Sequence, residues 1–596
     1  MTQAASPLPT WDLSDLYSGV DDPAIERDIE ELKERGRTFE ARFKGSIARA
    51  DLDAVHLRAA LDEYESLLRA EYRPQAFAML LFATHTQDPQ RGALLQQSRE
   101  FGSAMATHLV FFDLEIGQIP QPAYDAIAAS PELEPYRHYL DHQRLLAAHN
   151  LSEPEEKILV ETANVRGSAF GRLFTEVNGR SKFSLDIDGE HKEMTQSEIL
   201  ALLYAPERTT RRDAAAAITT GLRENAHIGT FIYNTLLHEK DVLDRLRAYA
   251  GPEESRHLDN ELSAAVVDTV VEVGVANYPT VAQYYELKRR LLGLEELAHY
   301  DRYAPLGGVQ THIPFDQAKD LVLEAFGEFS PRLVEIAEPF FSRRWIDAEL
   351  AEFKRGGAFC AGVTPDLHPY VMMNYTSQPR DVMTLAHELG HGIHDVLASG
   401  NHLLDYHPVL PMAETASTFA EMLVFDKLQA SLDSEADRLS LVCSKIEDTF
   451  ATVFRQIAMY RFEQQAHRAR RAQGELPTEK FDELWQANMQ EMFGGSLKLG
   501  AEHACWWLYI PHIVNTPFYV YAYAFGELLV LALYARYQCE GAAFVERYFA
   551  LLAAGGSRAP AELVAALGFD IAERAFWQGG CDLIQQRVQQ AVELAV

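Results

Sequence analysis

The chain has 596 residues, of which 47% are hydrophobic and 24% are charged, and its formal net charge is -33 at pH 7. These proportions are ordinary for a folded globular protein, so extensive disorder is excluded. The large negative charge argues against nucleic acid or an anionic membrane as the main partner, because both require a basic surface. The length is compatible with about three or four domains, or with one large elongated unit.

The sequence contains no segment that is expected to cross a membrane. Its densest apolar run, residues 528–534, is much shorter than the roughly 20 residues that a spanning helix needs. The N-terminal residues have neither the basic nor the apolar stretch of a secretory signal. The cysteines are scattered and form no CxxC pair, which predicts a cytoplasmic protein with mostly buried free thiols. They are Cys360, Cys443, Cys505, Cys539 and Cys581.

Helices are predicted along most of the chain, because apolar residues recur at spacings of three and four. Residues 24–45 and 477–495 are clear examples. Alternating apolar residues around an Asp188-Gly189 turn predict a small hairpin within residues 181–195. This hairpin suggests a boundary near residue 200, between an N-terminal helical region (1–200) and the remainder (201–596). A second strand region is expected within residues 358–375.

Residues 387–391 read "HELGH" and lie in a predicted amphipathic helix. His387 and His391 are one helical turn apart, so both imidazoles can reach one metal ion, and zinc accepts such nitrogens. Glu388 points about 100° away, where it can serve as a general base on water. His394 lies about 10 Å along the axis from His387, so we expect it behind the ligands or packed, not as a ligand. The alternative is an amphipathic helix that is merely rich in histidine.

A third metal ligand is expected downstream of this helix. The extended metzincin motif is excluded, because it requires glycine at position 394 and histidine at position 397. Glu414 follows His391 by 23 residues (414 − 391), in the first turn of a helix predicted after Pro411. Two histidines and one glutamate leave one zinc position open, as catalytic sites do. Glu421 is expected to accept a hydrogen bond from a ligand histidine. The alternatives are a helix N-terminal charge for Glu414 and a surface role for Glu421.

The motifs resemble those of a known family. "HELGHGIH" (387–394) followed by "AETASTFAE" (413–421) resembles the oligoendopeptidase F family of zinc metallopeptidases, which are relatives of thimet oligopeptidase and neurolysin. The resemblance covers nearly the whole chain, and its separate motifs occur in the family's order. The other motifs are "TWDLSDLY" (10–17), "WIDAELAEFKRGGAFC" (345–360) and "PHIVNTPFYVYAYAFGE" (511–527).

The resemblance implies a mainly α, elongated, two-lobed fold with a deep central channel and a small β region beside the zinc helix. It also implies that residues 201–596 form the catalytic zinc metallopeptidase domain, with one Zn²⁺ per chain. By matching positions, the metal ligands are His387, His391 and Glu414, and the general base is Glu388.

The resemblance further implies that the C-terminal loop stabilises the transition state. At the matching positions this loop supplies His512, Tyr519, Tyr521 and Tyr523, of which His512 and Tyr523 are the main candidates. Tyr519 shares a helical face with Tyr523 whereas Tyr521 would point elsewhere, and the sequence leaves open which of the two assists Tyr523. The alternative for these tyrosines is packing in the core with a satisfied hydroxyl group.

The predicted function is that of a zinc-dependent endopeptidase acting on short peptides. Gly357, Ala358, Phe359 and Cys360 are expected to offer backbone groups to an extended substrate, which predicts broad sequence preference. One alternative is a zinc carboxypeptidase or dipeptidyl carboxypeptidase on the same fold, and another is a non-catalytic peptide-binding protein with structural zinc. Neither nucleic acid nor membrane is expected as a partner, and the sequence makes no prediction of the oligomeric state.

Overall fold

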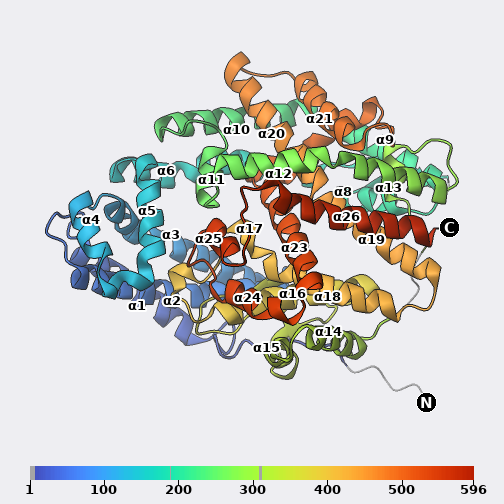
Figure 1. Cartoon of the computed structure of the whole chain (residues 1–596). Coiled ribbons are helices and arrows are strands. Elements are labelled where there is room, and N and C mark those ends of the chain that lie inside the picture. The colour runs from blue at the N-terminus through green and yellow to red at the C-terminus, as the bar shows by residue number, and fades with distance from the viewer. Residues whose placement is uncertain (1–6, 188, 308–311, 596) are drawn as a thin grey trace. The chain divides into compact units, whose positions relative to one another are not determined.

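The computed structural model describes residues 7–187, 189–307 and 312–595. Helices predominate in this part of the chain, and the strands are short (Figure 1). The mainly helical fold predicted from the sequence is therefore confirmed. The two example helices are present as α1 (Pro23–Phe43) and α21 (Thr478–Phe493).

The chain forms two compact units, each built from three segments. The first unit comprises Met1–Lys157, Thr311–Leu428 and Tyr537–Phe569. The second unit comprises Ile158–Gln310, Gln429–Arg536 and Asp570–Val596. The division near residue 200 and the channel between two lobes stay predictions.

Among the described residues, each helix lies wholly within one of the two units, except for three helices that contain residues of both units. The first unit contains α1, α2 (Ala54–Thr84), α3 (Pro89–Gly117), α4 (Gln121–Ala128), α5 (Arg137–Leu146), α14 (Phe315–Phe329), α15 (Pro331–Ser342), α16 (Pro379–Ala398), α17 (Leu410–Ala413), α24 (Ala542–Ala553) and α25 (Pro560–Ala565). The second unit contains α7 (Gly167–Arg180), α8 (Gln196–Ala201), α9 (Arg208–Glu224), α10 (Ala226–Leu246), α11 (Glu254–Asp259), α12 (Ala264–Ala276), α13 (Tyr278–Leu291), α19 (Glu435–Thr452), α20 (Phe454–Gln473), α21, α22 (Pro511–Asn515) and α26 (Arg574–Leu594). The helices that cross a boundary are α6 (Glu153–Thr162), α18 (Thr415–Ser431) and α23 (Tyr521–Glu540).

The first unit contains a three-stranded sheet beside α16. Its order is β3 (Ile346–Asp347), β5 (Tyr370–Met372) and β4 (Phe359–Ala361), with β3 parallel and β4 antiparallel to β5. The strand region predicted at 358–375 is thus a pair of strands, and β4 is an edge strand. β3 was not predicted from the sequence, because two residues are too few to show an alternating pattern.

The N-terminal motif at residues 10–17 packs against this sheet. The ring of Trp11 lies 6.2 Å from that of Phe359 and 6.5 Å from that of Tyr370. The hydroxyl of Tyr370 donates to Asp15 Oδ2 at 2.7 Å. The start of the chain therefore supports the strand that pairs with β4, although more than 300 residues separate them in sequence.

The hairpin predicted at residues 181–195 is present in the second unit. β1 (Phe183–Ile187) pairs antiparallel with β2 (Glu190–Met194), and Asp188 of the expected turn lies outside the described residues. Phe183 is buried because Gly221 of α9 leaves room for its ring: a Cβ at 221 would lie 2.6 Å from it.

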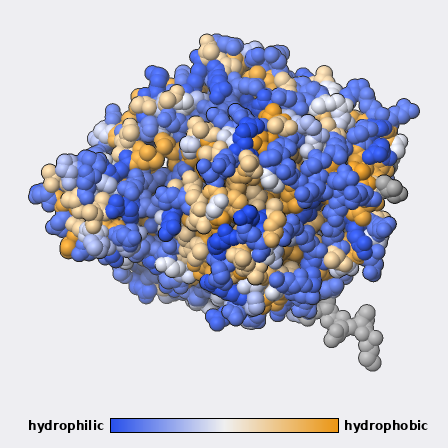
Figure 2. Space-filling view, in the orientation of Figure 1, coloured by the Kyte–Doolittle hydropathy of each residue, from blue (hydrophilic) through white to orange (hydrophobic). Residues whose placement is uncertain are grey.

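The face drawn in Figure 2 is largely polar, as expected from the 24% of charged residues in the sequence. Apolar side chains are scattered over this face. Over the described chain, no helix combines the length and the apolar character that a membrane crossing requires.

Candidate metal centre and active site

Helix α16 places the two histidines of the "HELGH" motif on one face. Its first turn is held by Asp381, whose Oδ2 accepts the backbone N–H groups of Thr376 and Gln378 at 2.6 and 3.0 Å. With the helix start fixed, His387 and His391 follow one turn apart. Their Nε2 atoms lie 3.2 Å from each other.

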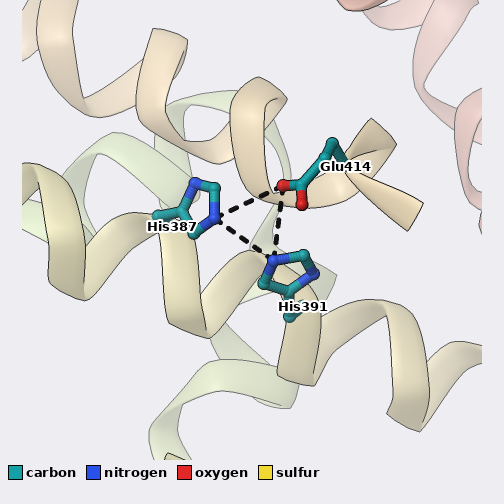
Figure 3. Close-up of side chains that lie close together, drawn as sticks. All are labelled: His387, His391 and Glu414. Carbon is teal, nitrogen blue, oxygen red and sulfur yellow. Dashed lines mark hydrogen bonds and ion pairs between the residues drawn. The ribbon is translucent and has the colours of Figure 1, made fainter. Parts of the chain in front are cut away.

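Glu414 reaches the same point from a break between two helices. The sequence placed it in the first turn of a helix after Pro411, but the short helix α17 ends at Ala413 and α18 begins at Thr415. Glu414 Oε2 lies 3.3 Å from His387 Nε2 and 3.4 Å from His391 Nε2. Figure 3 shows the three side chains pointing toward one another. Their potential ligand atoms all lie within 4.8 Å of one another.

A glycine on α16 allows this convergence. A Cβ at Gly390 would lie 2.5 Å from the Cα of Ser417, so only glycine lets the backbones of α16 and α18 approach this closely. The hydroxyl of Ser417 donates to Glu414 Oε2 at 2.6 Å and helps to hold the carboxylate. A role for Ser417 was not predicted from the sequence, although this residue lies in the "AETASTFAE" motif.

Glu421 holds the other side of the His387 ring. It lies on α18, two turns after Glu414, and His387 Nδ1 donates to its Oε1 at 2.6 Å. With Nδ1 engaged in this way, Nε2 is the nitrogen that faces His391 and Glu414. This arrangement fixes both the orientation of the ring and the nitrogen available to a metal ion.

The charges in this group favour a cation. Burial alone would lower the pKa of His387, but the hydrogen bond and charge of Glu421, together with Glu414 and Glu388, outweigh it and raise this pKa to about 9. Burial would raise the pKa of Glu414, but its contact with His391 and the charge of His387 lower it to about 2. The site therefore stabilises positive charge beside an ionised carboxylate.

Glu388 and His394 share α16 with the two histidines but have different surroundings. Glu388 is buried, and this burial raises its pKa against the opposing charges of His387 and His391. His394 is also buried, and burial lowers its pKa to about 3, so it is neutral at physiological pH. It is not a member of the group whose atoms converge.

A cavity of about 430 Å³ lies in front of these residues. Its lining comes from β4 and the residues around it, from one face of α16, and from the segment between His407 and Glu414. Gly357 and Ala358 lie just before β4, whereas Phe359 and Cys360 lie within it. The predicted substrate strand therefore borders the same cavity as the histidines, except that Gly357 does not line it. Two of the convergent side chains, His387 and His391, remain 28% and 24% exposed.

The C-terminal loop belongs to the second unit, where its predicted residues form a cluster of rings. The ring of Tyr519 lies 6.1 Å from that of His512 and 4.9 Å from that of Tyr523. The rings of His512 and Tyr523 are 5.9 Å apart. Burial and the nearby Arg455 lower the pKa of His512, so its imidazole is neutral at physiological pH.

Tyr521 differs from its neighbours, because its ring is buried and its hydroxyl is engaged. Asn260 Nδ2 donates to this hydroxyl at 2.8 Å. The expectation that Tyr521 points away from the other loop residues agrees with this contact.

A buried glutamate on α20 anchors the loop. Glu463 Oε1 accepts the backbone N–H of Phe518 at 2.9 Å, and Phe518 has the left-handed backbone angle φ of 59°. This conformation is strained for a residue with a large side chain, so the contact helps to maintain it. Burial raises the pKa of Glu463 to about 8. The sequence offered no signal for this residue, since the contact joins positions 55 residues apart.

Comparison with known proteins agrees with this site. The family model "Peptidase family M3" matches residues 201–583, and the model "Oligopeptidase F" matches residues 115–183. Oligopeptidase PepF of Bacillus subtilis is 26% identical over 594 residues, which cover 98% of this chain and 87% of that protein. An oligoendopeptidase F homolog of Lactococcus lactis is 24% identical over 600 residues, which cover 98% and 97% of the two chains.

Solved structures share the fold. A Chlamydophila abortus protein assigned as a peptidase superimposes with a TM-score of 0.87 at 23% identity, covering 99% of this chain and 98% of that one. Oligoendopeptidase-F from Enterococcus faecium gives a TM-score of 0.73 at 22% identity, covering 96% and 98%. The M3 family model spans more than half of the sequence and includes every residue of the convergent group. The chain therefore belongs to peptidase family M3 and is a metallo-oligopeptidase.

Proposed function

We propose that the chain is a zinc-dependent endopeptidase that cleaves internal bonds of short oligopeptides. The observation that carries the proposal is the convergence of His387 Nε2, His391 Nε2 and Glu414 Oε2 within 4.8 Å, at the wall of a cavity that an edge strand also borders. A catalytic group beside a free strand edge suits the hydrolysis of an extended peptide.

The donor atoms suit zinc. Two imidazole nitrogens and one carboxylate oxygen are the ligands of catalytic zinc sites that keep one position open. The hydrogen bond from His387 Nδ1 to Glu421 matches the support that ligating histidines receive in such sites. When bound, zinc supplies a Lewis acid that acidifies water and polarises a carbonyl group.

Glu388 is proposed as the general base. It follows His387 on α16 and lines the cavity. A carboxylate oxygen of Glu388 accepts the proton of the attacking water and then passes it to the nitrogen of the departing amine. The burial that raises its pKa makes it a stronger base when it is ionised. His394 is proposed to support α16 beneath the ligands as a neutral, packed side chain.

His512 and Tyr523 are proposed to donate hydrogen bonds to the oxyanion that forms at the scissile carbonyl, with Tyr519 assisting. Their rings pack against one another, with His512 on α22, Tyr519 in the turn before α23 and Tyr523 in the first turn of α23. A single donor of this kind typically contributes about 3 kcal/mol to transition-state stabilisation. The buried Tyr521 is not proposed to act on substrate.

The substrate is proposed to bind as an additional strand on β4. Because the sheet order is β3-β5-β4, one edge of β4 has no partner strand within the sheet. Val371 N–H donates to Trp345 on the β3 side, so Cys360, which stands opposite Val371, directs its backbone groups to the unpaired edge of β4. The backbone groups of Cys360 and of Ala358, two residues before it, are proposed to pair with an extended peptide, with Gly357 and Phe359 beside them. Recognition of this kind reads the peptide backbone, so it tolerates many sequences.

Two further features of the chain enter the proposal. Residues 201–596 are proposed to form the catalytic region and residues 1–200 an N-terminal helical region. A cytoplasmic location is proposed because all five cysteines are free thiols in the structure, which suits a reducing compartment.

Cleavage of a mixed peptide library, analysed by mass spectrometry, tests the function. The zinc-loaded protein should cut internal bonds of peptides that are blocked at both ends. Chelation should abolish cleavage and added zinc should restore it, whereas Glu388→Gln should keep its metal and lose about 10³-fold or more in kcat. Cleavage confined to peptides with a free C-terminus would favour the carboxypeptidase alternative. Activity of Glu388→Gln near that of wild type would refute the assigned base.

A further inference from the structure

Asp395 continues the row of metal-facing residues on α16. It follows His391 by four positions, as His391 follows His387, so the three side chains leave the helix on one face. One helical turn of four residues advances about 6 Å along the axis. Asp395 lines the same cavity as the histidines, beyond them along the helix.

The carboxylate of Asp395 occupies space that is free because residue 362 is a glycine. It lies against Gly362 at the end of β4, where a Cβ at 362 would come within 2.2 Å of Oδ2. Its side chain is 15% exposed. The Nδ1 atom of His407 is 3.9 Å from Oδ1, which is too far for a hydrogen bond. Among the described residues, none donates a hydrogen bond to this carboxylate.

The cavity is lined by three carboxylates, and its only basic side chains are histidines. Its lining includes the carboxylates of Glu388, Asp395 and Glu414, and it includes no lysine or arginine. Glu414 is assigned to the metal and Glu388 to water, so the proposed reaction leaves Asp395 without a role. Burial raises the pKa of Asp395 to about 7 and lowers that of His407. Among the described residues, no lysine or arginine pairs with Asp395, and His391, whose charge lowers its pKa, is assigned to the metal.

We propose that Asp395 determines specificity by binding a positively charged group of the peptide, either a Lys or Arg side chain or the α-ammonium of a free N-terminus. This inference rests on the proposed peptidase function. A strand advances about 3.3 Å per residue, so a group about 6 Å from the metal ligands belongs to a residue one or two positions from the cleaved bond. A cation there would provide both the charge and the hydrogen-bond donors that the carboxylate lacks.

Peptides that differ in one charged group test the proposal. One series carries a single lysine at each position around the cleaved bond and is blocked at both ends, with glutamine as the matched residue. A second series lacks lysine and has a free or an acetylated N-terminus. The dissociation constant of each peptide is measured in the zinc-loaded Glu388→Gln background, with and without Asp395→Asn. This readout does not require turnover.

At one position the lysine peptide should bind about 10- to 100-fold more tightly than the matched glutamine peptide, or the peptide with a free N-terminus should do so relative to the acetylated peptide. This ratio is expected for a charge-assisted hydrogen bond. In Asp395→Asn this ratio should fall to about one. The control Asp366→Asn, which removes an exposed carboxylate of the first unit that does not line the cavity, should keep the preference. A preference that survives in Asp395→Asn, or no cationic preference at any position, would overturn the proposal.

The stability of the variant distinguishes specificity from a structural role. An unbalanced buried carboxylate destabilises the fold, so the Tm of Asp395→Asn at pH 8 should equal or exceed that of wild type. A clearly lower Tm would assign Asp395 to the fold instead. If the zinc-loaded wild type cleaves no peptide, the proposed function fails, while the binding ratios in the Glu388→Gln background still decide the role of Asp395.

Discussion

The metal group and the C-terminal loop are positioned by different means. His387, His391 and Glu414 lie within 28 consecutive residues (414 − 387 + 1) and are held by direct polar contacts with one another, with Ser417 and with Glu421. The loop residues instead contact each other through aromatic rings, and two buried side chains that are distant in sequence hold the loop: Glu463 at the Phe518 N–H and Asn260 at the Tyr521 hydroxyl.

The difference indicates how each region responds to substitution. The polar contacts of the metal group place charge and ligand atoms directly, so changes there should alter the content of metal. The loop depends on anchors that touch no reacting atom, so changes there should alter turnover or stability while the metal remains bound. Variants of the two regions should therefore differ in zinc content, turnover and stability.

The largest effect within the loop is expected for Tyr523→Phe. Loss of the hydroxyl should lower kcat by about 10²-fold or more with little change in zinc content or Tm, because the proposed contact exists only in the transition state. Tyr521→Phe is the matched control. It should leave the buried Asn260 amide without its acceptor and cost about 1–3 kcal/mol of stability, with kcat unchanged. If Tyr523→Phe and wild type have the same kcat, the hydroxyl of Tyr523 does not act in catalysis and the residue serves only in packing.

A smaller loss of turnover is expected for Glu463→Ala. This change removes the acceptor of the Phe518 N–H, which should displace the loop and lower kcat about tenfold or more with little change in KM. Glu463→Gln retains a carbonyl acceptor and should restore most of the activity.

If Glu463 acts through the loop, the double variant Glu463→Ala/Tyr523→Phe should lose little more than Tyr523→Phe alone. Fully additive losses would show that Glu463 affects activity by another route.

A pH dependence of stability is also expected from Glu463. The pKa of Glu463 is raised from 4.5 in the unfolded chain to about 8 in the folded protein. Between these values the unfolded chain ionises first, so the wild type loses stability as the pH rises. Glu463→Gln lacks this loss, and its Tm should exceed that of wild type by a margin that grows from pH 4.5 to 8. Thermal unfolding of metal-free samples across this range measures the margin, and a constant margin would contradict the shifted pKa.

The members of the metal group could be predicted because they follow local rules. Helix periodicity places His387 and His391 together, and a glutamate at the start of a following helix is a common partner. The break in the helix at Glu414 was not predicted, because it depends on the close approach of α18 to Gly390.

The remaining features depend on contacts that have no periodic signature. Glu463 was missed because its partner is far away in sequence, and β3 because it is too short to alternate. Asp395 stands at helical spacing from His391, one residue beyond the "HELGHGIH" motif. The role proposed for Asp395 depends on its contact with Gly362 and on its place in the cavity, and both arise only when the chain folds.

The central claim is that Glu414 is a metal ligand and that Glu421 supports one. Glu414→Ala and Glu421→Ala should be loaded with zinc, dialysed side by side against the same chelator, and assayed for metal content. Glu414→Ala should emerge nearly metal-free, because two histidines alone hold zinc weakly. Glu421→Ala should retain zinc at moderate chelator strength, with affinity reduced about 10- to 100-fold. The opposite pattern, with Glu421→Ala empty and Glu414→Ala loaded, would contradict the ligand set.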